Sequence, residues 1–246
     1  MTLLKVDHLT KNFGGLSAVS NVNLSLEKNE LVGLIGPNGA GKTTLFNLLT
    51  GVYEPSEGEI RLEKDGKSEL LNKLAPYKIA TLGLSRTFQN IRLFKELTVM
   101  DNVLIAMNAK NKEGFLSSIF RLLSFYKQEE KMESKARQLL EIFDLAEKTE
   151  TLASNLPYGE QRRLEIVRAL ATDPQILFLD EPAAGMNPQE TAELTKLIRK
   201  IQEEFHITIL LIEHDMSLVM EVCERIYVLE YGQIIAEGLP EEIRSN

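Results

Sequence analysis

Apolar side chains alternate with polar ones in the first thirty residues of the chain. One alternating series covers residues 4–9 and another covers residues 22–26, with Gly14-Gly15 between them. A period of two is typical of strands with one buried face, and a glycine pair favours a turn. Residues 31–35 are almost continuously apolar, which is typical of a strand buried on both faces of a parallel sheet. The amino-terminal region is therefore predicted to consist mainly of strands.

A different periodicity occupies the middle of the chain. Between about residues 100 and 148 the apolar side chains follow helical spacing among charged neighbours. Short apolar runs return at 176–179 and 207–212, and the segment 190–204 between them again has helical spacing. The tail, 226–237, is predicted to form a hairpin. The predicted order is thus strands, a strand–helix unit, a helical insert and two further strand–helix units.

Composition and charge narrow the possible functions. The 246 residues suffice for one large domain or two small ones. The 28 Lys and Arg against 36 Asp and Glu leave a net charge of −8, which argues against a nucleic-acid partner because a phosphate backbone attracts basic surfaces. No apolar run approaches the roughly 20 residues that cross a bilayer, and Lys5 and Asp7 interrupt any signal-peptide core. With one cysteine, Cys223, we expect a cytoplasmic protein.

The apolar run at 31–35 ends in a glycine-rich segment, here termed the phosphate loop: Gly36-Pro37-Asn38-Gly39-Ala40-Gly41-Lys42-Thr43. It matches the pattern G-x-x-x-x-G-K-[ST] in full. Glycines let backbone amides point inward at phosphate oxygens, and the helix expected over 43–49 adds its positive amino end. In this pattern the Lys42 ammonium contacts the outer phosphates and the Thr43 hydroxyl holds Mg²⁺. The segment predicts a phosphate-binding loop rather than a plain turn.

An acidic pair follows the second buried run. Residues 176–179 are apolar, and Asp180-Glu181 come directly after them. Because successive side chains point in different directions where a strand ends, the two acids can have different tasks. We expect Asp180 to hold Mg²⁺ and Glu181 to face an attacking water. The alternative, an acidic pair that caps the turn at Pro182, is disfavoured by the complete phosphate loop.

Together with a third segment, these motifs resemble those of a known family. The phosphate loop, the acidic pair and Leu156-Pro157-Tyr158-Gly159-Glu160-Gln161, here termed the signature segment, follow the order found in the ATP-binding subunits of ABC transporters. The resemblance covers essentially the whole chain. It implies an α/β fold: a P-loop NTPase core with a mainly parallel sheet, an N-terminal antiparallel β subdomain and an inserted helical subdomain.

The resemblance also implies how the chain is divided. Residues 1–246 would form a single ATP-binding domain. Its core subdomain is expected at about 1–88 and 161–246, and its helical subdomain at about 89–160. A P-loop kinase or GTPase is the rival enzyme class, but it would leave the signature segment, Glu181 and His214 unexplained.

Further residues acquire roles from the resemblance. Phe13 occupies the position of an aromatic residue that stacks on adenine, although burial in a core is the alternative for a phenylalanine. Gln89 matches a glutamine that senses Mg²⁺ and contacts the membrane partner. His214, after the apolar run 207–212, matches a histidine that reaches the γ-phosphate.

The implied cofactors are ATP and Mg²⁺. Three side chains would surround the metal: Thr43, Gln89 and Asp180. Three would act in hydrolysis: Lys42, Glu181 and His214. The nucleotide would contact the phosphate loop and residues beyond it: Phe13, Gly36, Pro37, Asn38, Gly39, Ala40, Gly41, Lys42, Thr43, Thr44, Gln89, Tyr158, Gly159 and Glu160.

Local patterns narrow the choice within the family. Residues 158–166 and 182–188 resemble one ATPase of the branched-chain amino acid importers, and residues 86–94 fit the same group. That group is similar to the ATPases of lipopolysaccharide export, so an exporter is an alternative, as is a non-transport ABC ATPase. We therefore expect an ATP hydrolase that powers the import of leucine, isoleucine or valine.

Three positions depart from the family pattern. The usual signature is Leu-Ser-Gly-Gly-Gln, and here Pro157 and Tyr158 replace the serine and the first glycine. Because proline has neither a hydroxyl nor an amide hydrogen, the site that this segment completes is expected to lack one contact. Asn187 replaces the usual aspartate of the loop that crosses to the other subunit.

The resemblance finally implies partners. A second ATP-binding subunit, identical or related, would meet this one head to tail. Permease subunits would bind around residues 89–102, where Leu93 or Phe94 either anchors a membrane-subunit helix or packs the helical insert. A periplasmic or extracellular solute-binding protein would take part indirectly. The expected location is the cytoplasm, peripheral on the inner face of the membrane.

Overall fold

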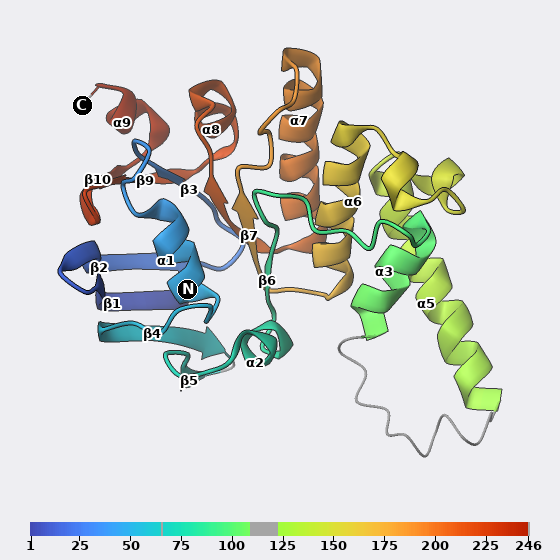
Figure 1. The fold of residues 1–246 in the computed structure, drawn as a ribbon, viewed down its shortest axis with the longest axis horizontal. Helices are drawn as coiled ribbons and strands as arrows, with labels where there is room; N and C mark the ends of the chain where they lie inside the picture. Colours follow the sequence, from blue (N-terminus) through green and yellow to red (C-terminus); the bar gives the residue numbers. More distant parts are fainter. Residues whose placement is uncertain (65, 109–122, 246) are drawn as a thin grey trace. The chain divides into compact units, whose positions relative to one another are not determined.

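The chain forms two units (Figure 1). The computed structural model describes residues 1–64, 66–108 and 123–245, with the backbone alone over 123–128. The core unit comprises Met1–Gln89 and Gln175–Asn246, and the helical unit comprises Asn90–Pro174. The division expected at about residue 160 differs from that of the structure, which falls after Pro174, because the intervening helix packs on other helices of the helical unit.

A six-stranded sheet runs through the core unit in the order β10-β9-β3-β8-β7-β6. All neighbours are parallel except β10, which pairs with β9 as an antiparallel hairpin. The strands β3, β7 and β8 are buried at every position, as continuous apolar runs require. The strands are β3 (Leu31–Ile35), β6 (Leu84–Arg86), β7 (Ile176–Asp180), β8 (Thr208–Ile212), β9 (Arg225–Glu230) and β10 (Gln233–Gly238).

A second, antiparallel sheet has the order β2-β1-β4-β5. Its first two strands form the hairpin expected around Gly14-Gly15, and both extend beyond the alternating residues. The other two strands had no alternating pattern that sequence reasoning detected, and every residue of β5 is exposed. The strands are β1 (Thr2–Phe13), β2 (Leu16–Glu27), β4 (Glu57–Lys64) and β5 (Lys67–Leu70). The expected fold class is therefore confirmed.

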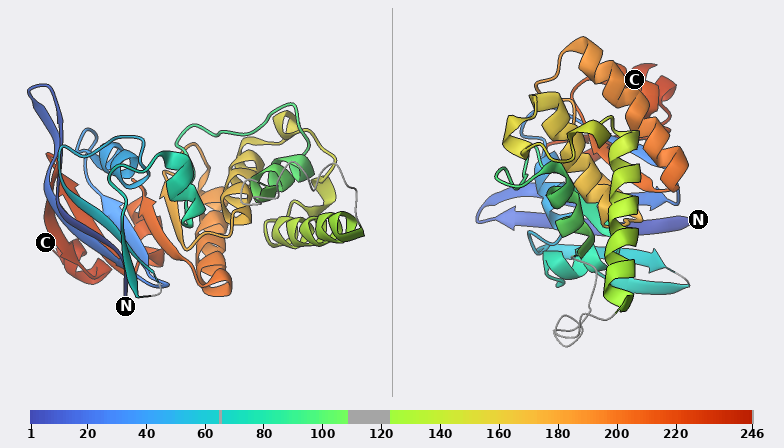
Figure 2. Two further views of the ribbon diagram at one scale, coloured as in Figure 1. Left: turned by 90° about the horizontal axis from the view of Figure 1, so that it is seen from below. Right: turned by 90° about the vertical axis from the view of Figure 1, so that its right-hand side faces the viewer.

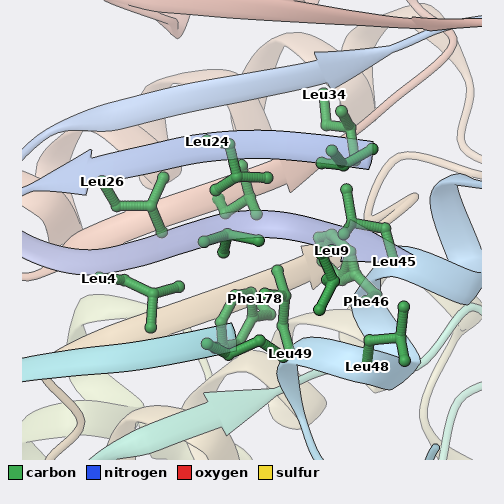
Figure 3. Close-up of a cluster of buried hydrophobic side chains, with 14 of the residues drawn as sticks. Leu4, Leu9, Leu24, Leu26, Leu34, Leu45, Phe46, Leu48, Leu49 and Phe178 are labelled. Carbon is green, nitrogen blue, oxygen red and sulfur yellow. The ribbon is translucent and has the colours of Figure 1, made fainter. Parts of the chain in front are cut away.

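The core joins both sheets to the helix α1 (Lys42–Leu49), as Figure 3 shows. Leu4 and Leu24 come from the antiparallel sheet, Phe178 comes from the parallel one, and all are almost fully buried. The Phe46 ring of α1 meets the Phe178 ring edge to face, with centroids 5.4 Å apart. This packing fixes α1 against the sheets, and therefore fixes the phosphate loop that precedes it.

The described residues of the core unit form four further helices: α2 (Pro76–Thr81), α7 (Pro188–Phe205), α8 (Met216–Val222) and α9 (Pro240–Ser245). The longest, α7, buries Leu194, Ile198 and Ile201 at the spacing of one helix face. It starts earlier than the expected 190–204 because Asn187 caps it. The Asn187 Oδ1 accepts from the backbone amides of Gln189 and Glu190, and the Glu190 carboxylate accepts from the Asn187 amide.

The helical unit contains α3 (Val99–Asn108), α5 (Leu123–Ile142) and α6 (Tyr158–Ala171), with short 3₁₀ turns at Ala146–Lys148 and Ala153–Asn155. In Figure 2 the helices α3 and α5 lie side by side, and α6 packs against both. The part of the expected helical segment at 109–122 lies outside the described residues. Among the described residues, no helix combines the length and the apolar character that a membrane crossing requires.

Candidate functional site

Three parallel strands bring the predicted motifs to one edge of the sheet. Leu34 of β3 pairs with Ile212 of β8, and Ile212 also pairs with Asp180 of β7. The loops after these strands therefore emerge side by side. They carry the phosphate loop, His214 and the acidic pair, so segments far apart in the sequence meet at the carboxyl ends of the strands, where open α/β sheets bind ligands.

The phosphate loop needs glycine at tightly packed positions. A Cβ on Gly36 would lie 2.0 Å from the Leu229 carbonyl oxygen, and a Cβ on Gly41 would lie 2.4 Å from the Ala18 carbonyl oxygen. Gly41 also has a φ of 104°, a value that favours glycine. The loop is held from outside because the Gly232 amide donates to the Ala40 carbonyl at 2.8 Å. The backbone is thus fixed in a shape that a side chain would prevent.

Lys42 is held inside this loop. Its side chain is 6% exposed, and its Nζ donates to the carbonyl oxygens of Gly36 (2.7 Å) and Pro37 (3.0 Å). Burial lowers the pKa of Lys42, while the nearby carboxylates of Glu181 and Asp180 act in the opposite direction. The ammonium is therefore anchored by neutral carbonyls and remains available to a stronger, anionic acceptor.

Asp180 is buried at the end of β7 and pairs with a residue that sequence reasoning missed. Its Oδ2 lies 2.7 Å from Nη2 of Arg86, and the two side chains are only 3% and 7% exposed. The same guanidinium donates through Nη1 to Asn47 Oδ1 of α1 at 2.6 Å. Arg86 thus links β6, β7 and α1. Of the other expected metal ligands, Thr43 is exposed at the end of the phosphate loop, and Gln89 donates a hydrogen bond to Glu181.

Glu181, Gln89 and His214 form a hydrogen-bonded group, here termed the Glu181 cluster. Gln89 Nε2 donates to Glu181 Oε2 at 2.7 Å, and His214 Nε2 lies 2.9 Å from Glu181 Oε1. Both carboxylate oxygens are therefore oriented by side chains from other elements. The Glu181 backbone has a φ of 48°, in the left-handed region that costs a non-glycine residue about 1–2 kcal/mol.

One cleft of about 560 Å³ brings most of the predicted residues together. Its lining includes Phe13, residues 38–44, and all three members of the Glu181 cluster. The Phe13 side chain is 42% exposed, so the alternative that it is a core aromatic is wrong. Its ring meets that of Tyr53 edge to face at 5.3 Å, with the Lys11 ammonium 5.1 Å from its centroid. Sequence reasoning missed several lining residues: Leu16, Ser17, Ala18, Tyr231 and Gly232.

Known proteins are similar to this chain in sequence and in architecture. A model of the ABC transporter family matches residues 19–184. The high-affinity branched-chain amino acid transport ATP-binding protein LivG of Escherichia coli (strain K12) is 50% identical over 244 residues, covering 99% of this chain and 94% of LivG. This chain belongs to the ABC transporter family of ATP-binding proteins. The family resemblance expected from the motifs is confirmed.

Solved structures of ABC transporter cassettes have the same fold. The ADP conformation of MJ1267, an ATP-binding cassette of an ABC transporter, is 34% identical with a TM-score of 0.84, covering 100% of this chain and 94% of that one. The dimeric structure of MJ0796, a bacterial ABC transporter cassette, is 25% identical with a TM-score of 0.80, covering 97% and 99%. The rival reading as a P-loop kinase or GTPase is therefore wrong.

The signature segment of this ABC protein lies in the helical unit, whereas every residue that lines the cleft lies in the core unit. Pro157 is the N-cap of α6 and supplies no side-chain cap. The Tyr158 side chain is 46% exposed, with the Arg162 guanidinium against its ring. Glu160 pairs with Lys148, at 2.5 Å between Oε1 and Nζ. Tyr158, Gly159 and Glu160 are thus not among the residues that the cleft brings together.

A second missed residue is Glu213, which directly precedes His214. Its side chain is 4% exposed. Burial raises the pKa of Glu213, and the backbone amides of Ala183 and His214, which donate to it, act in the opposite direction. Glu213 gave no signal in the sequence, because the Ala183 amide that donates to it lies thirty positions earlier.

Proposed function

We propose that this chain is the ATP-binding and ATP-hydrolysing subunit of a transporter that imports branched-chain amino acids. The observation that carries the proposal is the cleft in which the phosphate loop and the Glu181 cluster meet, in a chain half identical to LivG over nearly its whole length. The anionic phosphates match the loop, where inward amides and the Lys42 ammonium supply positive charge.

Nucleotide binding follows from the residues of the cleft. The exposed face of Phe13 offers a surface on which adenine stacks, since Tyr53 and Lys11 support the ring from other directions. Lys42 exchanges its carbonyl partners for phosphate oxygens, because a charge-assisted hydrogen bond is stronger than one to a neutral carbonyl. Phe13 is thereby assigned to the adenine end of the nucleotide and Lys42 to its phosphate end.

The residues expected around Mg²⁺ fit that ion by their chemistry. Thr43 supplies a hydroxyl and Asp180 a carboxylate, and oxygen atoms are the ligands that Mg²⁺ prefers. Bound there with the nucleotide, Mg²⁺ would neutralise charge on the outer phosphates. To hold the ion, Asp180 would give up its ion pair with Arg86.

Hydrolysis is assigned to the Glu181 cluster. One Glu181 oxygen takes a proton from the attacking water, and the contacts from Gln89 and His214 orient that carboxylate. His214 also steadies the transferring phosphoryl group through hydrogen bonding. Because the barrier to phosphoryl transfer is lowered mainly by position and charge, this arrangement supplies what the reaction requires.

The proposed transporter also contains partner subunits. Two ATP-binding subunits meet head to tail, so that each signature segment faces the other subunit's phosphate loop. The bacterial cassette MJ0796 likewise has a dimeric structure. Permease subunits dock near Phe94, whose side chain is 46% exposed and whose ring is covered on one side by the Arg168 guanidinium at 4.8 Å. The subunit thus works at the cytoplasmic face of the membrane, with a solute-binding protein outside.

The function is tested with Glu181→Gln in the assembled transporter. The variant should bind ATP as the wild type does, while hydrolysis falls at least about a hundredfold because the proton acceptor is lost. Uptake of labelled leucine into vesicles that hold the wild-type transporter should require ATP and should stop in the variant.

Two outcomes would contradict this assignment. Unchanged turnover in the variant would remove Glu181 from the role of base. ATP hydrolysis by the wild type without uptake of leucine, isoleucine or valine would exclude the import function, and would favour an exporter or a non-transport ATPase.

A further inference from the structure

A buried carboxylate links the two loops that carry the Glu181 cluster. Glu213 follows the last residue of β8 and is 4% exposed. Its Oε1 accepts from the Ala183 amide at 2.7 Å, and its Oε2 accepts from the His214 amide at 3.0 Å. One side chain therefore holds the backbone two residues after Glu181 and the backbone of His214 itself.

The loop that begins at Glu181 requires such support. The Glu181 backbone φ of 48° is unfavourable for a residue with a side chain. A conformation of this kind persists only where the surrounding structure determines it. The Glu181 amide donates to the Ile212 carbonyl at 2.9 Å, which secures the first residue of the turn. The Ala183 amide, secured by Glu213, fixes the other side of the same turn.

Burying the Glu213 carboxylate destabilises the fold unless hydrogen bonds compensate for its lost hydration. A buried carboxylate loses its hydration, and only hydrogen bonds or ion pairs compensate. Here the compensation comes from backbone amides of the two loops, so the carboxylate and the loop geometry depend on each other. The strand register, which pairs Asp180 with Ile212, places both loops within reach of this one residue.

We propose that Glu213 is a positioning residue that keeps Glu181 and His214 in their hydrogen-bonded arrangement. It acts through the backbone of both loops and does not touch the nucleotide. The inference rests on the proposed hydrolytic function of the Glu181 cluster. Its consequence is that Glu213 sets the rate of hydrolysis without setting the affinity for nucleotide, because the phosphate loop and Phe13 lie on other elements.

The experiment compares Glu213→Gln with Asp215→Ala in the full chain, assembled with its transporter partners. Glutamine keeps the shape of the side chain but turns one acceptor into a donor that faces a backbone N–H. Asp215 is the matched control, because its carboxylate accepts from the Ser217 and Leu218 amides and caps α8. Removing this cap lowers the stability of the fold and keeps the Ala183 and His214 amides that donate to Glu213.

Glu213→Gln is expected to lower kcat by about tenfold or more, since small misplacements of reacting groups are costly, with an unchanged dissociation constant for ATP. Asp215→Ala is expected to lower the melting temperature with kcat unchanged. In the full chain, the amide proton resonance of Ala183, which donates to Glu213, should move in Glu213→Gln and stay in place in Asp215→Ala. If Glu213→Gln does not fold, Glu213→Asp takes its place in the experiment. Its shorter carboxylate reaches one amide, so its kcat should fall by less than the roughly tenfold expected for the glutamine variant.

The outcomes separate the inference from the function on which it rests. A wild-type kcat in both Glu213 variants would overturn the positioning role. So would a fall in kcat that accompanies a lower melting temperature to the same extent in the Asp215 control as in the Glu213 variants. Absence of ATP hydrolysis by the wild-type assembly would instead overturn the proposed function.

Discussion

Buried charged and reactive side chains define this protein at the scale of single residues. Arg86 pairs with Asp180, Glu213 accepts backbone amides, and Lys42 donates to carbonyls of its own loop. Each group has lost its hydration and has gained oriented partners instead. The phosphate loop and the acidic pair could be predicted because local sequence patterns specify them. Arg86 and Glu213 could not, because their partners become neighbours only when the sheet forms.

Cys223 gives a prediction at this scale. It is 6% exposed, and burial raises the pKa of its thiol to about 12. The reactive thiolate is therefore scarce at neutral pH. We expect a disulfide reagent such as Ellman's reagent to leave the native protein unlabelled at pH 7.5 and to label one thiol per chain in denaturant. Stoichiometric labelling of the native protein within minutes would show that this residue is accessible.

At the scale of elements, periodicity predicted the segments that are long or fully buried. β3, β7, β8 and α7 lie where their apolar patterns indicated. β6 was missed because three residues are too few to show a period, and β5 because its side chains are all exposed. These elements depend on pairing with neighbours, which no local pattern records.

The start of α6 gives a prediction at the scale of elements. Pro157 supplies no side-chain cap there, and serine is among the preferred residues at this position. Pro157→Ser should raise the free energy of unfolding by about 0.5–1 kcal/mol, measured by chemical denaturation. In the assembled transporter it should also raise ATP turnover, because a hydroxyl is restored to the signature segment. Pro157→Ala, which adds no hydroxyl, is the control, and equal effects of both variants would contradict the explanation.

At the scale of the whole molecule, the core unit holds all the residues that line the cleft. The core of this unit joins two sheets and α1, so nucleotide bound at the phosphate loop is linked to the folding of the entire unit. The expected division of the chain came from the family resemblance, whereas in the structure α6 packs against α3 and α5 and so belongs to the helical unit.

This linkage predicts thermal stabilisation by nucleotide. A ligand at a hundred times its dissociation constant stabilises the native state by about 2.7 kcal/mol, which corresponds to about 5–10 °C in Tm for a protein of this size. Lys42→Ala should reduce the shift at the same ATP concentration because the ammonium no longer contacts the phosphates. Thermal scans of both proteins with and without ATP provide the measurement, and equal shifts would exclude Lys42 from binding.

The capping box at Asn187 has a consequence for assembly. Asn187, the N-cap of α7, has both its side chain and its backbone amide hydrogen-bonded within its own chain. The loop that leads to it is therefore already ordered in the isolated chain at its carboxyl end. When two subunits of the proposed pair meet at this loop, ordering it therefore costs little conformational entropy. Association is favoured by this preorganisation rather than by a charged contact from residue 187.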